Sequence, residues 1–316
     1  MNLDILIPTY NRSSYLIKNI AIIHEIASKL PNACIRVIVS DNASTDDTKT
    51  KMEDYICAHP KLTVLYYRQN DNIGFCGNLI YTLSKSDADY VLTLGDDDYI
   101  NFDYMSNALK AIEEDSEIKC VLPSFQAINE RGDHLSFGRD LGGTRKIYSA
   151  GAASVCANAG RAHQISGIIL KREGLLDALR NAQIDNLYPQ IFLTSYSCLN
   201  GKCLHLPEYP VLVTQTEKKA WNYDDVGLLN DIFQNYARVG MKGFDRFSAE
   251  KEMLRTQRWR ALRYWKNPIK QLKVIAKISY GHNTSVPGKF LIPPMLIYYW
   301  SRWSVSNILR KISGCR

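Results

Sequence analysis

The chain has 316 residues, of which 46% are hydrophobic and 22% are charged, and it carries a formal net charge of +7. This composition is typical of a globular protein with one large core, or with a nucleotide-binding domain and a smaller appendage. The eight cysteines lie far apart in the sequence, without a CxxC pair or a Cys/His spacing that suits zinc. We therefore expect reduced thiols and no zinc-binding module.

No stretch of the sequence has the length and composition of a membrane span. The first eight residues lack the basic flank and the small-residue cleavage site of a signal peptide. The longest apolar stretch, residues 290–300, contains two prolines and is too short to cross a bilayer of about 30 Å. We expect a cytoplasmic protein without a spanning segment.

Positive charge gathers in the C-terminal third, from Lys242 onward, where acidic residues are few. Such asymmetry indicates an anionic partner surface. No helix-turn-helix, zinc or RNP pattern accompanies the charge, so we expect no nucleic-acid partner and favour a membrane surface.

The first hundred residues alternate short β-branched runs with helical periods, which is typical of a parallel α/β sheet. Buried strands are predicted at residues 3–7, 35–40, 62–67 and 90–94, and helices at about 12–30, from the polar 41–47 segment to 57, and at 75–84. In such sheets ligands lie at the carboxyl ends of the strands. Four loops, at residues 8–11, 40–42, 68 and 95–98, are therefore expected to meet at one crevice.

The pattern after Tyr99 is looser. It predicts a helix at 104–114, a strand at 120–125, a strand at 165–170 and a helix at 187–199, with mostly helical structure from Trp221 onward. The polar, glycine-containing stretch from 129 to 143 reads as a mobile loop.

The strongest chemical signal is the strand that ends in Asp96, Asp97 and Asp98. Three adjacent carboxylates repel one another unless a cation or hydrogen-bond donors compensate them. A divalent metal does so economically, because Mg²⁺ and Mn²⁺ prefer carboxylate, phosphate and water oxygens. A solvated acidic turn is the alternative for an isolated triplet, but the end of a fourth buried strand favours a metal and diphosphate site.

Four motifs in order carry a resemblance. They are Ile-Pro-Thr-Tyr-Asn-Arg at 7–12, Val-Ser-Asp-Asn-Ala-Ser-Thr-Asp at 39–46, the segment 70–78 with Asn72, Gly74 and Asn78, and Leu-Gly-Asp-Asp-Asp at 94–98. Over about residues 1–200 the chain resembles glycosyltransferase family 2 with the GT-A fold, and it is similar to O-antigen or capsule enzymes such as abequosyltransferases.

The resemblance implies an α/β fold, a Rossmann-like nucleotide-binding domain with a mostly parallel central sheet, followed by a basic helical extension. A catalytic domain is expected at 1–215, with the nucleotide-sugar part at 1–100 and the acceptor side at 101–215, and a helical region at 216–316. The donor would be a UDP, CDP or dTDP sugar, and the acceptor a glycan or a polyprenyl-diphosphate-linked oligosaccharide. A basic C-terminal region would then lie at the inner face of the plasma membrane.

Carried over position by position, the resemblance also implies a site. Asp41 would accept a hydrogen bond from the pyrimidine, Asp96 would lie near the ribose, and Asp97 with Asp98 would hold Mn²⁺ or Mg²⁺. Gly95 stands where many members have the first acid, so the division of labour among the three acids stays open. The nucleotide-binding set is Pro8, Thr9, Tyr10, Asn11, Asp41, Arg68, Asn72, Gly74, Asn78 and Asp96.

Transfer with inversion requires a carboxylate that takes the proton of the acceptor hydroxyl. Asp185 stands where the family has its Glu-Asp pair, although Ile184 replaces the glutamate. A helix N-cap is the alternative role for Asp185, and Asp140 is the reserve candidate. His163 and Trp221 are candidate acceptor contacts, beside the alternatives of a structural histidine and a core tryptophan.

Apolar and basic residues interleave at helical spacing in the last sixty residues. This pattern is typical of helices that lie in the headgroup region of an anionic bilayer. A helical subdomain that packs on the catalytic domain or on a second subunit is the alternative, and both can hold. The apolar series is Trp259, Leu262, Trp265, Ile269, Leu272, Ile275 and Ile278.

Two other functions compete with transfer. A sugar-nucleotide nucleotidyltransferase also combines an α/β sheet with a metal-binding carboxylate, but it would have a glycine-rich phosphate loop, and residues 7–12 contain no glycine. A non-catalytic, membrane-associated carbohydrate-binding protein would have no need for four acids, Asp41 and the triplet, at a diphosphate site.

Overall fold

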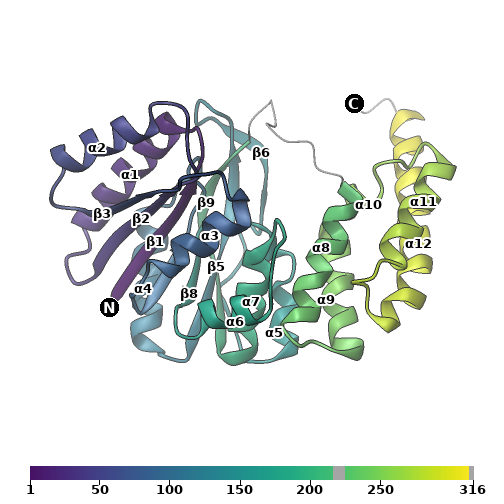
Figure 1. Cartoon of the computed structure of the whole chain (residues 1–316). Coiled ribbons are helices and arrows are strands. Elements are labelled where there is room, and N and C mark those ends of the chain that lie inside the picture. The colour runs from purple at the N-terminus through teal and green to yellow at the C-terminus, as the bar shows by residue number, and fades with distance from the viewer. Residues whose placement is uncertain (216–224, 313–316) are drawn as a thin grey trace.

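The computed structural model describes residues 1–215 and 225–312. One sheet runs through the first part of the chain, and helices alone make up the second (Figure 1). The strands are β1 (Asn2–Thr9), β2 (Cys34–Asp41), β3 (Thr63–Arg68), β4 (Tyr90–Thr93), β5 (Ile118–Ile128), β6 (His134–Arg139), β7 (Lys146–Tyr148), β8 (Ile168–Lys171) and β9 (Lys202–Thr214). Their order is β3-β2-β1-β4-β8-β5-β9-β7, with β6 paired to β5.

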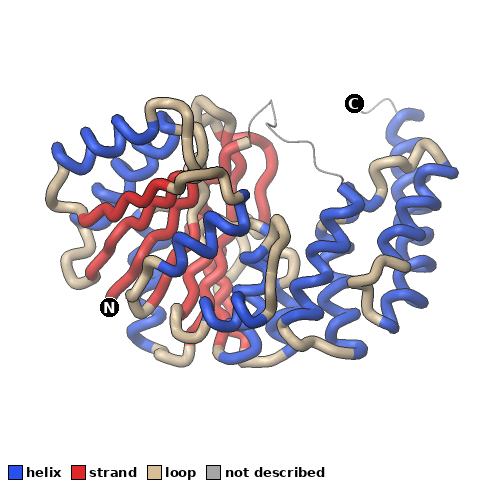
Figure 2. Tube along the Cα trace, in the orientation of Figure 1, coloured by secondary structure: helices blue, strands red, loops and turns tan. Residues whose placement is uncertain are grey.

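Helices cover both faces of the sheet (Figure 2). One face packs on α1 (Ser13–Ser28), α2 (Thr48–Ala58) and α4 (Phe102–Glu114), through a core that includes Leu16, Met52 and Tyr104. The other face packs on α3 (Gly74–Ser84), α5 (Ala152–Asn158), α6 (Leu175–Asn181) and α7 (Pro189–Asn200), beside the short 3-10 turn Arg161–His163. This arrangement confirms the predicted α/β class with its Rossmann-like half.

The first four strands are parallel, and their register brings the predicted loops together. Thr9 of β1 is opposite Asp41 of β2, and Asp41 is opposite Arg68 of β3. β4 pairs with the other side of β1, with Thr93 opposite Leu6. The residues that follow β4 therefore lie beside the carboxyl end of β1, as the strand order requires.

One expectation is wrong. Residues 129–143 were expected to form a mobile loop, whereas they contain β6, which pairs antiparallel with β5. The strand is mostly exposed, so its sequence lacks the apolar alternation that identifies a half-buried strand. A turn from Asn129 to Asp133 reverses the chain between β5 and β6. In this turn the Asn129 backbone amide donates to the Asp133 carbonyl oxygen, and the Gly132 amide donates to the Asn129 carbonyl oxygen.

The helical prediction is confirmed for residues 225–312. These residues form α8 (Asp225–Arg238), α9 (Gly243–Thr256), α10 (Arg258–Ala261), α11 (Pro268–Ser279) and α12 (Val286–Ile312). Buried side chains such as Phe233, Met253 and Ile278 belong to the same apolar cluster as the sheet residues Leu6 and Ile38. The helical region is thus built onto the core of the sheet-containing part, which agrees with the subdomain alternative. The division at 215/216 stays a prediction.

None of the helices within the described residues has both the length and the apolar character needed to span a membrane. The apolar stretch at 290–300 is the middle of α12 and includes Pro293 and Pro294.

Glu250 ties α9 to the start of α12. Its carboxylate is fully buried and accepts hydrogen bonds from the Ser285 amide at 2.9 Å, the Ser285 hydroxyl at 2.7 Å and Arg246 Nε at 3.1 Å. Burial raises the pKa of Glu250. A buried carboxylate with three donors stabilises the junction only while all of them remain in place.

We expect Glu250→Ala to lower the free energy of unfolding by about 2 to 4 kcal/mol, because three buried donors lose their acceptor. Urea denaturation followed by circular dichroism measures this. Glu252→Ala, two residues away on the same helix, removes an ion pair with the exposed Arg255 and should stay within about 0.5 kcal/mol of the wild type. Equal effects of the two changes would contradict the role given to Glu250.

Candidate functional site

The acidic triplet lies where the carboxyl ends of β1, β2 and β4 meet. Asp96 Oδ2 accepts a hydrogen bond from the Thr9 hydroxyl at 2.7 Å. Nη1 of Arg12 bridges two of the acids, at 3.2 Å from Asp96 Oδ1 and 2.6 Å from Asp97 Oδ2. The first and fourth motifs of the sequence are thus joined directly, through Thr9 and Arg12.

Asp98 has a different environment. Its side chain is buried and accepts hydrogen bonds from the Thr214 amide at 2.8 Å, from Gln164 Nε2 at 3.1 Å and from the Ser166 hydroxyl. These donors lie at the end of β9 and just before β8. Asp98 therefore connects the parallel half of the sheet to β8 and β9, and a metal bound by Asp98 would have to share both of its oxygens with protein hydrogen-bond donors.

The acids carry more negative charge than the protein compensates. Burial raises the pKa of Asp96 to about 6 and that of Asp98 to about 7, and the charge of Asp97 adds to both shifts, while Arg12 opposes the shift at Asp96. Asp97 is the most accessible of the three, with 16% of its side chain exposed. An accessible carboxylate beside two buried acids fits a divalent cation.

The loops after β1 and β2 have a strained backbone that is held by side chains. Asn11 and Ala43 adopt left-handed conformations, with φ of 53° and 63°. Asn11 Oδ1 accepts from the Thr45 amide at 2.7 Å, and the Asn11 amide donates to the Ser44 hydroxyl at 2.9 Å. Asparagine suits such a position because its short polar side chain bonds locally. Strain of this kind is typical of ligand-binding loops.

Asp41 is fully buried at the start of the loop that follows β2. Its Oδ1 accepts from the Ser44 amide at 2.8 Å, and its Oδ2 accepts from the Tyr66 hydroxyl at 2.6 Å. Arg68 lies beside it, with Nε 3.6 Å from Oδ2, and donates from Nη2 to the Ser44 carbonyl oxygen at 2.8 Å. Asp41 thus shapes the loop, and its predicted contact with a pyrimidine stays a prediction.

The other nucleotide-binding candidates separate into exposed and buried groups. Tyr10 is 42% exposed at the end of β1, next to the buried Pro8 and Thr9. Asn72 Oδ1 accepts hydrogen bonds from the side-chain Nδ2 of Asn42 at 2.9 Å and from the backbone amide of Gly74 at 3.0 Å, and so forms the turn into α3.

Asn78 lies behind the crevice. It is buried in α3. Its side-chain Oδ1 accepts a hydrogen bond from the Ser40 hydroxyl, and its Nδ2 donates to the Ser40 carbonyl oxygen. Asn78 therefore holds α3 against β2, and any effect on a nucleotide would act through Ser40.

Asp185 lies exposed in the loop before α7. It is not the N-cap of α7, because Tyr188 takes that position and the side chain of Asn186 accepts from the Tyr188 amide at 2.8 Å. This loop contacts the first turn of α3, where the Cys76 thiol donates a hydrogen bond to the Ile184 carbonyl oxygen at 3.5 Å. The structure thus leaves the Asp185 carboxylate accessible near the start of α3.

Asp140, the reserve candidate, is a poor base in this structure. Its carboxylate lies 2.8 Å from Arg161 Nε and 3.3 Å from His205 Nε2. Although burial opposes the shift, the hydrogen bonds from His205 and Arg161 hold the pKa of Asp140 well below its usual range. A carboxylate stabilised as an anion accepts a proton weakly.

The ring of His163 lies 4.9 Å from that of Tyr188. Burial lowers the pKa of His163 to about 3, so the ring is neutral, and its Nε2 is buried without a hydrogen-bond partner. Trp221, the second acceptor candidate, lies outside the described residues.

Sequence reasoning missed the residues that connect the two sides. Gln164, Ser166 and Thr214 reach Asp98 from segments that show no motif. Arg260 of α10 donates a hydrogen bond to the Tyr188 hydroxyl at 2.9 Å and so links the basic helical region to the start of α7.

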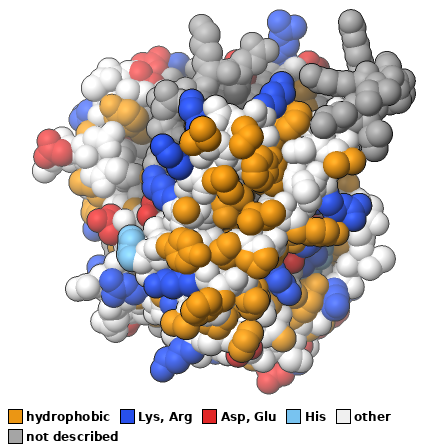
Figure 3. Space-filling model, turned by 90° about the vertical axis from the view of Figure 1, so that its right-hand side faces the viewer, with side chains coloured by type: hydrophobic (Ala, Val, Ile, Leu, Met, Phe, Trp, Pro, Cys, Tyr) orange, Lys and Arg blue, Asp and Glu red, His pale blue; other side chains and the backbone are white. Residues whose placement is uncertain are grey.

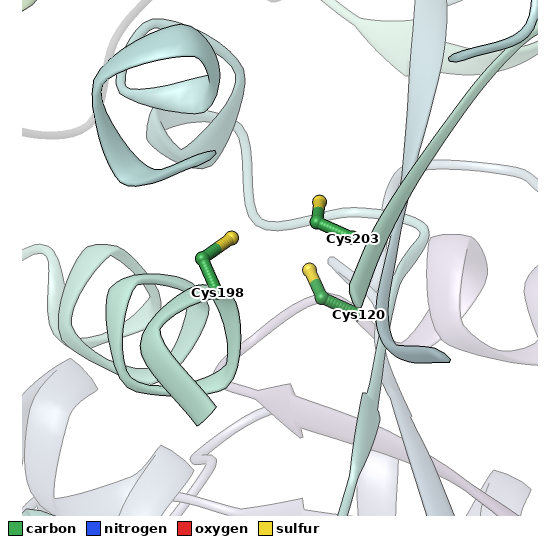
Figure 4. A group of neighbouring side chains, drawn as sticks. All are labelled: Cys120, Cys198 and Cys203. Atoms are coloured by element: carbon green, nitrogen blue, oxygen red, sulfur yellow. The ribbon is translucent and has the colours of Figure 1, made fainter. Parts of the chain in front are cut away.

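Three cysteines from two separate parts of the chain meet at the opposite end of the sheet. Cys120 of β5, Cys198 of α7 and Cys203 of β9 are fully buried, and their sulfur atoms all lie within 4.8 Å of one another (Figure 4). Burial raises the pKa of Cys120 well above its usual range, whereas hydrogen bonds from Cys120 and Cys203 lower the pKa of Cys198 well below it. The first residues of β5 and β9, opposite each other, thus pack with α7 away from the acidic crevice.

Comparisons with known proteins bear on this site. A family model described as glycosyl transferase family 2 matches residues 4–163. Abequosyltransferase RfbV of Salmonella typhimurium is 26% identical over 238 residues, which cover 70% of this chain and 68% of that protein. Chondroitin synthase of Escherichia coli is 27% identical over 135 residues, 43% of this chain but 19% of that protein. The chain thus spans about a fifth of chondroitin synthase.

Solved structures share the fold. Residues 1–349 of S. aureus TarS, in complex with UDP-GlcNAc, superpose with a TM-score of 0.65 at 15% identity, over 88% of this chain and 81% of that one. The mannosyltransferase PcManGT from Pyrobaculum calidifontis, in complex with GDP-Man and Mn²⁺, gives 0.57 at 15% identity, over 99% and 88% of the two chains.

We expect Asp98→Ala to lower the free energy of unfolding by about 1 to 3 kcal/mol, because the donors from Gln164, Ser166 and Thr214 lose their acceptor. Thermal and urea denaturation at neutral pH measure the change. Asp103→Ala, at an exposed position in the first turn of α4, is the matched control and should have a smaller effect. A neutral Asp98→Ala would contradict its connecting role.

Proposed function

The chain belongs to glycosyltransferase family 2, and we propose that it transfers a sugar from a nucleoside diphosphate sugar to an acceptor hydroxyl with the help of Mn²⁺ or Mg²⁺. The observation that carries the proposal is the accessible Asp97 carboxylate beside the buried Asp96, at the meeting point of three parallel strands. The donor's diphosphate would lie at Asp97, and its nucleoside along residues 8–11 and the loop after Asp41.

The residues of the crevice have distinct parts in this reaction. Thr9 and Arg12 fix the orientation of Asp96, so its free lone pairs face a fixed direction. Arg12 also places one positive charge next to Asp97, close to the expected position of the leaving group. A divalent cation held by Asp97 would stabilise the negative charge that develops on the departing nucleoside diphosphate.

Asp185 is the proposed base. Its carboxylate is solvent-accessible and lies in a loop that contacts α3, so a donor and an acceptor could meet between the triplet and this loop. A carboxylate that takes the proton of the acceptor hydroxyl as the bond forms raises the nucleophile's reactivity. Attack from the side opposite the leaving group would invert the anomeric centre.

The acceptor is proposed to be a polyprenyl-diphosphate-linked oligosaccharide of O-antigen or capsule synthesis, at the inner face of the plasma membrane. The similarity to abequosyltransferase RfbV and the basic helical region support this choice. His163 and Arg260, on either side of Tyr188, are the proposed acceptor contacts.

Asp97→Asn should abolish the metal-dependent part of nucleotide binding. We expect one of UDP, CDP, GDP or dTDP to bind more tightly with Mn²⁺ than without it, and the variant to lose at least the roughly 10- to 100-fold typical of weakened metal sites. Isothermal titration calorimetry gives both constants. Asp103→Asn is the matched control. A nucleotide affinity that changes neither with Mn²⁺ nor with the Asp97→Asn substitution would contradict the proposed donor site.

Asp185→Asn should reduce kcat by roughly 100- to 10,000-fold, the range for loss of a general base, while the donor affinity stays unchanged. The measurement is transfer of a radiolabelled sugar to a lipid-linked acceptor, together with calorimetry of the nucleotide. Asp177→Asn, an exposed carboxylate in α6, should leave kcat unaltered. Retained turnover in Asp185→Asn would assign the base elsewhere.

A further inference from the structure

The outer side of α11 and α12 is a large apolar surface. Figure 3 shows hydrophobic side chains covering the middle of this face, with lysines and arginines around them. Ile269 is 70% exposed and Phe290 is 74% exposed, values that are unusual for side chains of this size. Apolar surface of this extent on one face marks an interaction site.

Helix α11 has apolar residues on two opposite sides. Val274, Ile275 and Ile278 are buried against the core. Ile269, Leu272, Ala276 and Tyr280 recur three or four residues apart, and all are exposed. At 3.6 residues per turn these two sets lie about half a turn from each other, so the second stripe points into solvent.

Helix α12 repeats this arrangement. Ile292 and Leu296 are buried, whereas Val286, Phe290, Ile297, Tyr298 and Val305 are between 47% and 74% exposed. The two helices lie against each other as a pair (Figure 1). Their exposed stripes together form what we call the outer face, made of Ile269, Leu272, Tyr280, Val286, Phe290, Leu291, Ile297, Tyr298 and Val305.

The charge around the outer face has one sign. Residues 253–316 contain no aspartate or glutamate, and they carry thirteen lysines and arginines. In α11 the exposed Lys270, Lys273 and Lys277 follow one another at helical spacing, directly beside the apolar stripe. The thirteen are Arg255, Arg258, Arg260, Arg263, Lys266, Lys270, Lys273, Lys277, Lys289, Arg302, Arg310, Lys311 and Arg316.

A cavity of about 460 Å³ opens between α10 and the later turns of α12. It is lined by Arg258, Tyr298, Arg302 and Trp303, among others. Arg302 donates from Nη1 to the Tyr298 hydroxyl at 3.1 Å, which orients the guanidinium. Two guanidinium groups and several aromatic rings line the cavity, and this composition suits a phosphate ester next to an apolar surface.

We propose that the outer face docks onto an anionic lipid bilayer, with the apolar stripes among the headgroups, the lysines against lipid phosphates, and one headgroup phosphate in the Arg258–Arg302 cavity. Aromatic and aliphatic side chains flanked by lysine are the composition that such a surface requires. A second copy of the chain fits less well, because two such faces would bring only positive charges together.

The docked face would also place the crevice at the membrane, a step that rests on the proposed function. α10 supplies Arg258 to the cavity and Arg260 to the Tyr188 hydroxyl on the acceptor side. The C-terminal end of α12 lies at the same end of the molecule as the carboxyl end of β9 (Figure 1). A lipid-linked acceptor would therefore approach the triplet from this end of the molecule.

The test is co-sedimentation of the full chain with vesicles of phosphatidylcholine alone or mixed with phosphatidylglycerol. Wild type should bind the anionic vesicles and lose binding as salt rises. The double variant Ile269→Ser with Phe290→Ser should bind at least about tenfold more weakly, because it removes apolar area that docking onto the bilayer would bury. Lys270→Glu with Lys273→Glu should weaken binding to anionic vesicles only, and Arg258→Ala with Arg302→Ala should reduce the preference for phosphatidylglycerol.

The matched control is Phe137→Ser with Ile147→Ser, which changes an aromatic and an aliphatic residue, each 51% exposed, in β6 and β7. Unchanged vesicle binding by the outer-face variant would overturn the proposal. So would a wild-type dimer, seen by light scattering, that the same variant splits, because a second copy would then cover the face. Nucleotide calorimetry separates the two ideas: vesicle binding without nucleotide binding would reject the proposed function alone.

Discussion

The need to compensate three adjacent carboxylates at the end of β4 governs the architecture of the site. Parallel pairing brings Thr9 and Arg12 to Asp96 and Asp97, and the turn toward β8 brings Ser166 to Asp98. Even so, the pKa of Asp96 and of Asp98 remains raised, because these partners are too few for buried anions. The result is a concentration of negative charge at the end of β4, of which Asp97 is the most accessible part.

The three acids divide their work by direction. Asp96 faces β1 and the first motif, Asp98 faces β8 and β9, and Asp97 faces the crevice. Asp98 therefore joins the parallel half of the sheet to the start of β8 and the end of β9.

The parallel half was predictable because its signals are local. Buried strands give short apolar runs, and the carboxyl ends of parallel strands must meet, so the places of Thr9, Asp41 and Asp97 followed from order alone. β6 was missed because an exposed strand has no apolar alternation. Gln164, Ser166 and the meeting of Cys120, Cys198 and Cys203 depend on contacts between distant segments, for which one sequence carries no signal.

The C-terminal helices show how a periodic pattern can have two correct readings. The apolar series from Trp259 to Ile278 was consistent with packing on the catalytic part or with a membrane surface. In the structure the series divides: Leu262, Ile275 and Ile278 are buried, whereas Trp259, Ile269 and Leu272 are exposed. A helix that had only to pack on the core would place polar residues on its outer side, because exposed apolar groups gain nothing in water. The outer stripe beside a row of lysines therefore requires an explanation outside the fold of a single chain, and the absence of acids after Glu252 points that explanation toward an anionic surface.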